Sequence, residues 1–506
     1  MAWVGAIWPG DDGRRVTSRL KAAAIMSAAM VILATVANIV FVSPAEAIPV
    51  FARQTGQPCG TCHTDFPGLT PFGRQFKLNG YTAGGGAYRS QLFPRDPVET
   101  QKPWAPPVAI FGVLGFTHTE APQPNPAPYK PNDNVVAGPI SFFTGGAITD
   151  HIGAFAQVTY SPTPPGGLGP FDHNWSWDNV DIRYANRTVI GDVPVVFGLT
   201  ANNNPTVQDV WNTVPAWVFP YMTSVTGSPD APPNPFGRAG PPAPLIDGAL
   251  AQRVASAGGY VYVDGKLYLE ASAYGSLNFK TQNNLGVNPF GGPGLIDGAA
   301  PYVRAAYEQN WRDHSFQIGA FGMFASIRPW IGPTDGTGSL DTLPFTDKYT
   351  DIGIDTQYQY RGSNYWLTLR GSYIHEIQRL DASFAAFNTN QSNTLNNLRA
   401  QASLAYGGDN RIVLTGQYFK TWGSPDPTLY PAGAGVPDDL NPNFSPNTSG
   451  WTAEIAYIPF MESRAPIWPW LNARIGLQYT YYNEFSGDRI HAHDNNTLFA
   501  YIWFAM

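Results

Sequence analysis

Hydrophobic and polar residues alternate with a period of two along most of the chain. Between Val108 and Met506 the alternation falls into about sixteen segments of roughly 10 to 14 residues. Clusters of Gly, Pro, Asn and Asp separate the segments, as expected for turns and loops. The pattern therefore predicts an all-β chain of about sixteen antiparallel strands over residues 108–506.

The two faces of each predicted strand differ in polarity. In one late segment the two faces are Leu471, Ala473, Ile475, Leu477, Tyr479 and Tyr481 on one side, and Asn472, Arg474, Gly476, Gln478 and Thr480 on the other. Segments that begin near Ile352 and Leu398 repeat the pattern. A membrane barrel turns its apolar face to lipid and its polar face to the lumen, so the first set is expected outside and the second inside.

Loop lengths distinguish a membrane barrel from a soluble β-sandwich, whose strands would also alternate. The tight turns lie at Asp150-His151, Gly191-Asp192, Asp264-Gly265, Arg312-Asp313, Gly362-Ser363 and Gly408-Asp409. The long connections between them lie at 119–139, 204–252, 331–347 and 424–446. Short turns at one end and long loops at the other are typical of outer-membrane barrels.

Composition agrees with this interpretation. Aromatic residues make up 14% of the chain, and many lie near segment ends, where a barrel carries its interfacial girdles. The 47 prolines concentrate in the predicted loops, so they do not require disorder. The final segment, 498–506, resembles the aromatic C-terminal strand of outer-membrane proteins, although it ends in Met506. The net charge of −7 argues against nucleic acid as a partner.

The first 47 residues are predicted to be an export signal. Arg14, Arg15, Arg19 and Lys21 precede an apolar run from Ala22 to Val42, and Ala45-Glu46-Ala47 offers a cleavage site. An uncleaved membrane anchor is the alternative, because the run approaches bilayer-spanning length.

Both cysteines of the chain lie in the sequence Cys59-Gly60-Thr61-Cys62-His63. In a c-type cytochrome two thiols bind the haem vinyl groups and the adjacent His binds the iron, which this spacing satisfies. A zinc site would need further ligands, a thioredoxin-like motif would need a βαβ setting, and a disulfide would leave His63 unexplained. The motif therefore predicts one covalent haem c on Cys59, Cys62 and His63.

The stretch from Phe51 to Tyr81 closely resembles the cytochrome segment of the outer-membrane fused cytochrome-porins, a family that includes the iron oxidases of iron-oxidising bacteria. The resemblance implies a short monohaem segment, residues 48–107, in or near the lumen of a porin-like barrel, residues 108–506. It also implies electron transfer from an extracellular donor to periplasmic c-type cytochromes.

Further haem contacts are harder to assign. Met323 lies on the polar parity of its predicted strand, so it is a candidate second axial ligand, with gap filling in the lumen as the alternative. Arg74 and Lys77, close to the motif, are candidate partners of the haem propionates, and Arg53 is a further candidate. The resemblance carries over these positions but not their roles.

Two functions of different classes follow for an outer-membrane protein of this kind. The first is an electron conduit with Fe(II) as the expected donor, hence an Fe(II):cytochrome c oxidoreductase; no nucleophile or acid–base constellation indicates other chemistry. The second is a porin or transporter in which the haem segment plugs, senses or stabilises the channel. A periplasmic cytochrome with a soluble β domain is a third possibility, which the loop asymmetry disfavours.

Overall fold

The computed structural model describes residues 49–506 except 90, 94–99, 124–128, 163–172, 225, 227–241, 332–340, 409, 431–442 and 463–468. The predicted export signal, residues 1–47, lies outside the described residues. Among the described helices, none combines the length and the apolar character that a membrane-spanning helix needs, a finding that does not bear on β-barrels.

Eighteen strands form one sheet in the described part of the chain. Two of them, β8 (Gly294–Ile296) and β11 (Asp341–Thr342), are short and pair with the last residues of β10. The other sixteen build the wall. They are β1 (Val108–Thr119), β2 (Asn134–Ala147), β3 (Ile152–Tyr160), β4 (Trp175–Ile190), β5 (Val193–Asn202), β6 (Val254–Val263), β7 (Leu267–Ser276), β9 (Ala300–Trp311), β10 (His314–Ile331), β12 (Asp347–Arg361), β13 (Tyr365–Arg379), β14 (Ser392–Tyr406), β15 (Arg411–Gly423), β16 (Thr448–Ile458), β17 (Asn472–Glu484) and β18 (Thr497–Ala505).

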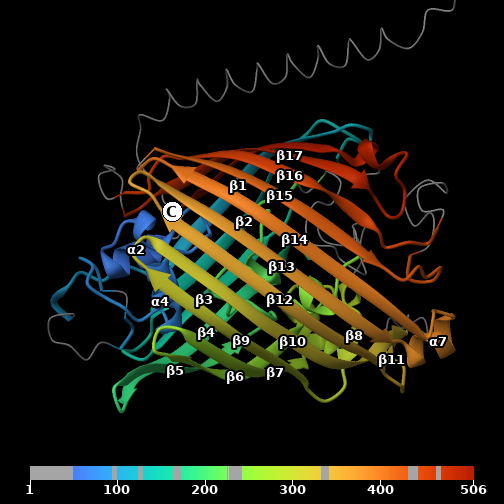
Figure 1. Ribbon diagram of the computed structural model, residues 1–506, viewed down its shortest axis with the longest axis horizontal. Helices are drawn as coiled ribbons and strands as arrows, with labels where there is room; N and C mark the ends of the chain where they lie inside the picture. The colour runs from blue at the N-terminus through green and yellow to red at the C-terminus, as the bar shows by residue number, and fades with distance from the viewer. Residues whose placement is uncertain are drawn as a thin grey trace, which may run out of the picture. The chain divides into compact units, whose positions relative to one another are not determined.

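The wall is a closed barrel. Each long strand pairs antiparallel with its neighbours, and the last strand, β18, pairs with the first, β1, from Phe111 opposite Ala505 to Thr119 opposite Thr497. Beyond that register, Ile110 and Met506 exchange two backbone hydrogen bonds. The prediction of an antiparallel barrel of about sixteen strands is confirmed (Figure 1).

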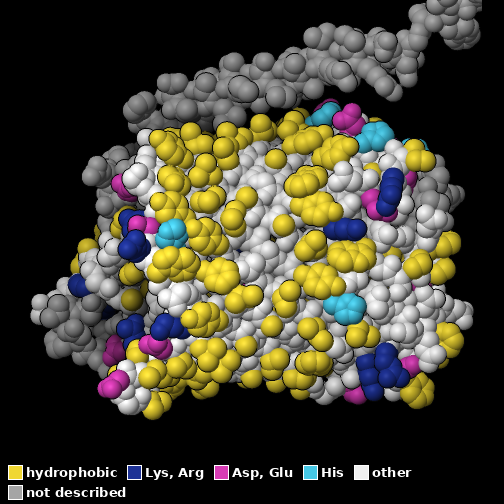
Figure 2. Space-filling model, viewed as in Figure 1, with side chains coloured by type: hydrophobic (Ala, Val, Ile, Leu, Met, Phe, Trp, Pro, Cys, Tyr) yellow, Lys and Arg dark blue, Asp and Glu magenta, His cyan; other side chains and the backbone are white. Residues whose placement is uncertain are grey.

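The two faces of the wall have the predicted polarity. On β17, Arg474, Gln478 and Thr480 are fully buried inside, whereas Ile475, Tyr479 and Tyr481 lie outside. Figure 2 shows apolar side chains spread across the outer face of the strands. An apolar exterior around a polar interior is the arrangement of an outer-membrane barrel.

The two ends of the barrel differ in their connections. Tight turns join β4 to β5, β6 to β7, β9 to β10, β12 to β13 and β14 to β15, all at what we call the short-turn end. The connections at the opposite, long-loop end include 203–253, 332–346 and 424–447, and they carry the remaining short helices. These helices are η1 (Pro215–Trp217), η2 (Leu245–Ala249), α6 (Phe279–Asn284), η3 (Pro289–Gly291), α7 (Asp381–Phe387) and η4 (Ala492–Asn495).

Residues 49–89, the N-terminal segment, occupy the short-turn end of the lumen. The segment contains α2 (Pro49–Thr55), α3 (Cys59–Cys62) and α4 (Pro71–Leu78) (Figure 1). Strands on opposite sides of the barrel contact it: Tyr260 on β6 donates to Leu78 O at 2.6 Å, and Arg474 on β17 donates to Phe66 O at 3.1 Å. Residues 49–89 therefore contact strands on both sides of the barrel.

The connection between β5 and β6, here called the crossing loop (residues 203–253), also folds inward. Its Trp211 donates to Glu308 on β9 at 3.0 Å, and its Asp247 pairs with Arg399 on β14 at 2.7 Å. It lies directly on the N-terminal segment, because Leu69 N donates to Asn212 Oδ1 at 3.1 Å. The sequence predicted only a long connection at 204–252, whereas the described residues of this loop contact side chains that face the lumen.

Candidate functional site

The single-turn helix α3 carries both cysteines of the motif. Cys62 is three positions after Cys59, with Gly60 and Thr61 between them, so the two sulfurs lie on the same side of one helical turn. Neither cysteine forms a disulfide; Cys59 is buried and Cys62 is half-buried. His63 ends the turn, with its backbone N–H donating to Cys59 O at 2.9 Å. The fold thus presents two thiols and one imidazole within a single turn.

Helix α4 holds the motif turn from one side. Thr70 caps α4 by accepting from Gly73 N, and its own groups reach back to the motif: its N–H donates to Cys62 O at 2.9 Å and its hydroxyl to Thr61 O at 2.5 Å. The packing is close, because a Cβ on Gly73 would lie 2.3 Å from Cys62 O. Only glycine allows α4 to approach the motif at this position.

The barrel holds the motif from the other side. Gly60 N donates to Met461 O at 2.7 Å, which ties the turn to the connection between β16 and β17. Arg411, at the start of β15, donates to His63 O at 3.1 Å and to Thr64 O at 2.8 Å. The motif is therefore fixed in part by contacts to its backbone.

The His63 side chain is set among aromatic rings. Its ring centroid lies 5.0 Å from that of Phe66, which in turn lies 5.7 Å from Trp503 on β18. Among the described residues, Nδ1 is buried without a hydrogen-bond partner within bonding distance. Desolvation lowers the pKa of His63 to about 4, although the backbone of Pro67 and Gly68 favours the protonated ring. The imidazole is consequently neutral at pH 7, the form that ligates metals.

Burial acts on the cysteines as well. It raises the pKa of the Cys62 thiol to about 12, so the thiolate is disfavoured at this position. A zinc site requires thiolates, whereas a thioether carries no charge and tolerates an apolar setting.

Three arginines of the barrel wall surround residues 60–68, and sequence reasoning did not select them for the site. Arg411 lies beside Gly60, Arg474 beside Phe66, and Arg370 Nη2 would lie 3.2 Å from a Cβ on Gly68. Arg370 Nη2 has no hydrogen-bond partner among the described residues. These arginines could have been identified from the sequence, because each lies at a lumen-facing position of its strand and close to a short turn.

Arg74 faces the barrel wall and not the motif. Its guanidinium donates to Glu308 at 2.6 Å, to Gln359 at 2.7 Å and to Ser315 at 2.7 Å, and it is fully buried. The predicted pairing with a haem propionate is not supported, because these partners already use the guanidinium. Arg74 anchors α4 to β9, β10 and β12.

The Lys77 ammonium is also engaged by groups other than the motif. Its ammonium donates to Val207 O at 2.6 Å and to Asp209 O at 2.8 Å in the crossing loop, and it lies 4.8 Å from the centre of the Trp217 ring. Lys77 therefore joins the N-terminal segment to the crossing loop, and the predicted propionate contact is not supported here either. Arg53, similarly, donates to Val108 O at 2.7 Å.

Lys77 makes the stability of the barrel depend on pH. Burial lowers its pKa from 10.5 to about 7, against the opposing effect of Asp181. Between these values the unfolded chain binds the proton and the folded chain does not, so stability rises with pH, by about 2 kcal/mol between pH 7 and 9. Unfolding midpoints of the solubilised protein over this range should show the rise, and Lys77→Met should remove it; equal slopes in both proteins would contradict the assignment.

Met323 has the predicted inward parity and is fully buried, but it lies far from the motif. It belongs to a core cluster with Val214 of the crossing loop and Tyr302 of β9, whereas Cys59 belongs to a different cluster. Met323 is about 26 Å along β10 from Ser315, the β10 residue that Arg74 contacts. The structure thus does not bring it to His63; Met461 and Met222 are the methionines in and against the cluster of Cys59.

The donor set suits a c-type haem. Two cysteines that form no disulfide lie on one turn, the next residue is an imidazole whose buried Nδ1 has no hydrogen-bond partner among the described residues, and the Phe66 ring lies beside that imidazole. No group of three or more His, Cys, Asp or Glu side chains suited to a metal ion occurs among the described residues. Cys59, Cys62 and His63 are accordingly the residues that would hold the group.

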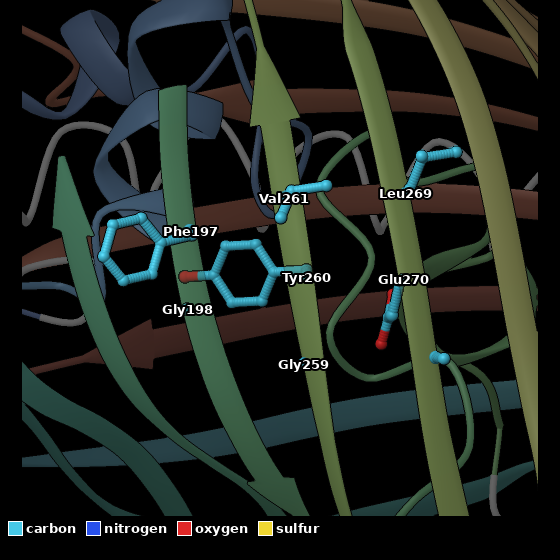
Figure 3. Close-up of a pocket in the computed structure, with 8 residues that line it drawn as sticks. Phe197, Gly198, Gly259, Tyr260, Val261, Leu269 and Glu270 are labelled. Atoms are coloured by element: carbon cyan, nitrogen blue, oxygen red, sulfur yellow. The ribbon is translucent and has the colours of Figure 1, made fainter. Parts of the chain in front are cut away.

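A hollow of about 440 Å³ lies elsewhere, between β5, β6 and β7. Figure 3 shows it beside Gly198 and Gly259, with Phe197, Val261 and Leu269 around it. Gly259 leaves room on the outer face, where a Cβ on it would lie 3.6 Å from Leu199 Cδ2. Phe197 and Leu269 are exposed on the outer face of the barrel, so the hollow is a dent in the lipid-facing wall.

No protein-family model and no curated protein matches the chain. Among solved structures, OprB of Pseudomonas putida is similar with a TM-score of 0.43 at 13% identity, covering 79% of this chain and 92% of that chain. The outer-membrane channel DcaP of Acinetobacter baumannii gives 0.40 at 11% identity, covering 79% and 96%. OmpT, an outer-membrane protein of Vibrio cholerae, gives 0.38 at 8% identity, covering 79% and 97%. At these scores the similarities say nothing about what the chain does.

Proposed function

We propose that the chain is an outer-membrane electron conduit. An extracellular donor, proposed to be Fe(II), gives an electron to one haem c held by Cys59, Cys62 and His63, and a periplasmic c-type cytochrome removes it. The short-turn end then faces the periplasm and the long-loop end the exterior, as in other outer-membrane barrels.

The observation that carries this proposal is the location of the motif inside the barrel. Gly60 N donates to Met461 O and Arg411 donates to His63 O, so the motif lies inside the barrel, against its wall at the short-turn end. The hydrocarbon band of such a barrel is about 25 Å tall. A redox group within the lumen shortens the path that an electron must cross, whereas a group outside the barrel leaves the whole band to be crossed.

The filled lumen supports a conduit over an open pore. Polar side chains that face inward on strands around the barrel are buried, including Asp181 on β4, Asp351 on β12 and Gln478 on β17. A water-filled channel would leave such side chains hydrated. The described crossing loop and N-terminal segment bond to these strands, as Ile246 N does to Asp351 and Tyr81 to Asp181.

The chain's own residues would perform three tasks. Cys59 and Cys62 would attach the group, and His63 would bind its iron with a neutral imidazole. Arg370, whose Nη2 has no hydrogen-bond partner among the described residues, places positive charge beside Gly68, which favours a carboxylate such as a haem propionate nearby. Phe66 and Trp503 exclude water beside His63. The haem itself supplies reversible one-electron chemistry when bound.

Reduction by Fe(II) tests the proposal directly. The chain is produced with a cytochrome maturation system, purified in detergent, oxidised and mixed with Fe(II) in a stopped-flow spectrophotometer. We expect rapid appearance of the ferrous haem spectrum, with dithionite reduction as the full-scale control. A haem that dithionite reduces but Fe(II) leaves oxidised at the organism's working pH would rule out iron as the donor.

Conductance separates the conduit from the alternative, a porin or transporter with a haem plug. In planar bilayers the conduit predicts little or no ion current from the inserted protein, because the lumen is packed. Channels of porin size in protein that carries its haem would contradict the conduit and favour the porin. The same preparation serves both measurements, so the two functions are compared on one material.

A further inference from the structure

Four hydrogen-bond donors form a row on the outer face of the barrel. Ser326 on β10 is opposite Lys348 on β12, Lys348 is opposite Arg379 on β13, and Arg379 is opposite Ser392 on β14. Their chain neighbours Asp347 and Gln378 are buried in the lumen, so by strand alternation the row faces outward. With strands about 4.8 Å apart, the row spans about 14 Å. We call these four residues the donor row.

The donor row lies at the edge of the apolar band. One step toward the short-turn end, the outward residues on the same strands include the exposed Phe324 and Ile377, followed by Ile352. In the other direction β10, β12 and β13 soon end in long loops. Figure 2 shows Lys and Arg side chains at the margins of the apolar face, among them a group near the place of α7 in Figure 1. The row is therefore at the level where lipid chains give way to headgroups.

The two cations of the row are a destabilising pair in the protein alone. Like charges directly opposite each other on neighbouring strands repel. Lys348 and Arg379 are both exposed, and neither forms an ion pair or a side-chain hydrogen bond with any described residue. The nearby Arg328, by contrast, is neutralised by Asp297 at 3.4 Å, and Asp381 accepts from Gln391 at 2.9 Å.

We propose that the donor row binds the phosphate group of a phosphorylated lipid in the outer leaflet. A phosphate accepts two parallel bonds from a guanidinium and a third from an ammonium, and its negative charge removes the repulsion between Lys348 and Arg379. The two serine hydroxyls at the ends of the row extend the contact to neighbouring polar groups of a bulky headgroup. This inference depends only on the barrel lying in the outer membrane, so it stands or falls separately from the haem.

Lipid binding to the full, detergent-solubilised chain tests the inference. The probes are bisphosphorylated lipid A, its dephosphorylated form, phosphatidylglycerol and inorganic phosphate, followed by native mass spectrometry. We expect the double variant Lys348→Ser with Arg379→Ser to bind bisphosphorylated lipid A at least tenfold more weakly. The matched control removes two exposed cations at the short-turn end, Lys266→Ser with Arg361→Ser, and should bind it like the wild type.

The remaining probes decide the chemistry of the ligand. Dephosphorylated lipid A should bind the wild type and the row variant equally, and inorganic phosphate should not displace the lipid. The proposal would be overturned if both double variants lost the same affinity for bisphosphorylated lipid A, or if neither variant lost any. Full displacement by inorganic phosphate would overturn the assignment to a lipid, and stronger binding of phosphatidylglycerol than of lipid A would overturn the assignment to a bulky headgroup.

Discussion

Replacing Cys59 and Cys62 by serine is expected to remove all covalently bound haem from the chain. Each sulfur is the only atom at its position that can add to a haem vinyl group, so no partial substitute exists. The chain should still fold into the barrel, because backbone contacts from Thr70 and Met461 hold the motif turn. The mass of the denatured polypeptide and a haem-stained gel provide the measurement.

The single variants and a neighbouring control make the result specific. Cys59→Ser and Cys62→Ser alone should each leave one thioether and a weaker haem signal, and Thr61→Ala should leave the full haem adduct. Thr61 contributes its backbone carbonyl to Thr70, which alanine retains. If the wild-type chain carries no mass of haem after production with a maturation system, the haem proposal is wrong.

Replacing Arg74 by methionine is expected to lower the free energy of unfolding by about 3–5 kcal/mol, because it leaves Glu308 buried without its cationic partner. Glu308 Oε1 lies 2.6 Å from Arg74 Nη2, and both side chains are almost completely inaccessible. The same change frees α4 from β9, β10 and β12, so the N-terminal segment should become open to protease. Thermal unfolding and limited proteolysis of the solubilised protein measure the two effects.

Two further variants assign the loss to the buried charge. Adding Glu308→Gln to Arg74→Met should restore much of the stability, since it removes the unpaired carboxylate. Arg187 also bonds to the N-terminal segment, donating to Asn79 at 2.6 Å, but it is exposed; Arg187→Ala should therefore cost less than about 1 kcal/mol. Similar losses in Arg74→Met and Arg187→Ala would mean that burial of the pair is not the cause.

The barrel was predictable from the sequence because lipid and lumen impose opposite demands on successive residues. Arg474 and Gln478 on β17 alternate with Ile475 and Leu477, and the structure gives each the expected face. The positions of the short turns were also predictable, since Gly and Asp mark them. These signals are local, so they survive without any knowledge of the tertiary structure.

Tertiary contacts were not predictable in the same way. Strand parity placed Met323 in the lumen correctly but could not give its height relative to His63. Closeness in sequence suggested that Arg74 and Lys77 serve the motif, whereas their partners, Glu308 and the crossing loop, lie more than a hundred residues away. The crossing loop itself has the Pro- and Gly-rich composition of an outer loop, and only its apolar residues, such as Trp211, hinted that it folds inward.

The close fit of the motif turn fixes an order of events during biogenesis. Cys59 is 8% exposed once the N-terminal segment is seated, and Gly73 and Met461 touch the turn directly. An enzyme that joins a porphyrin to these sulfurs needs room around them that the finished protein does not offer. If the motif carries the proposed haem, its attachment has to precede this packing, so that the strands enclose a segment to which the porphyrin is already bound.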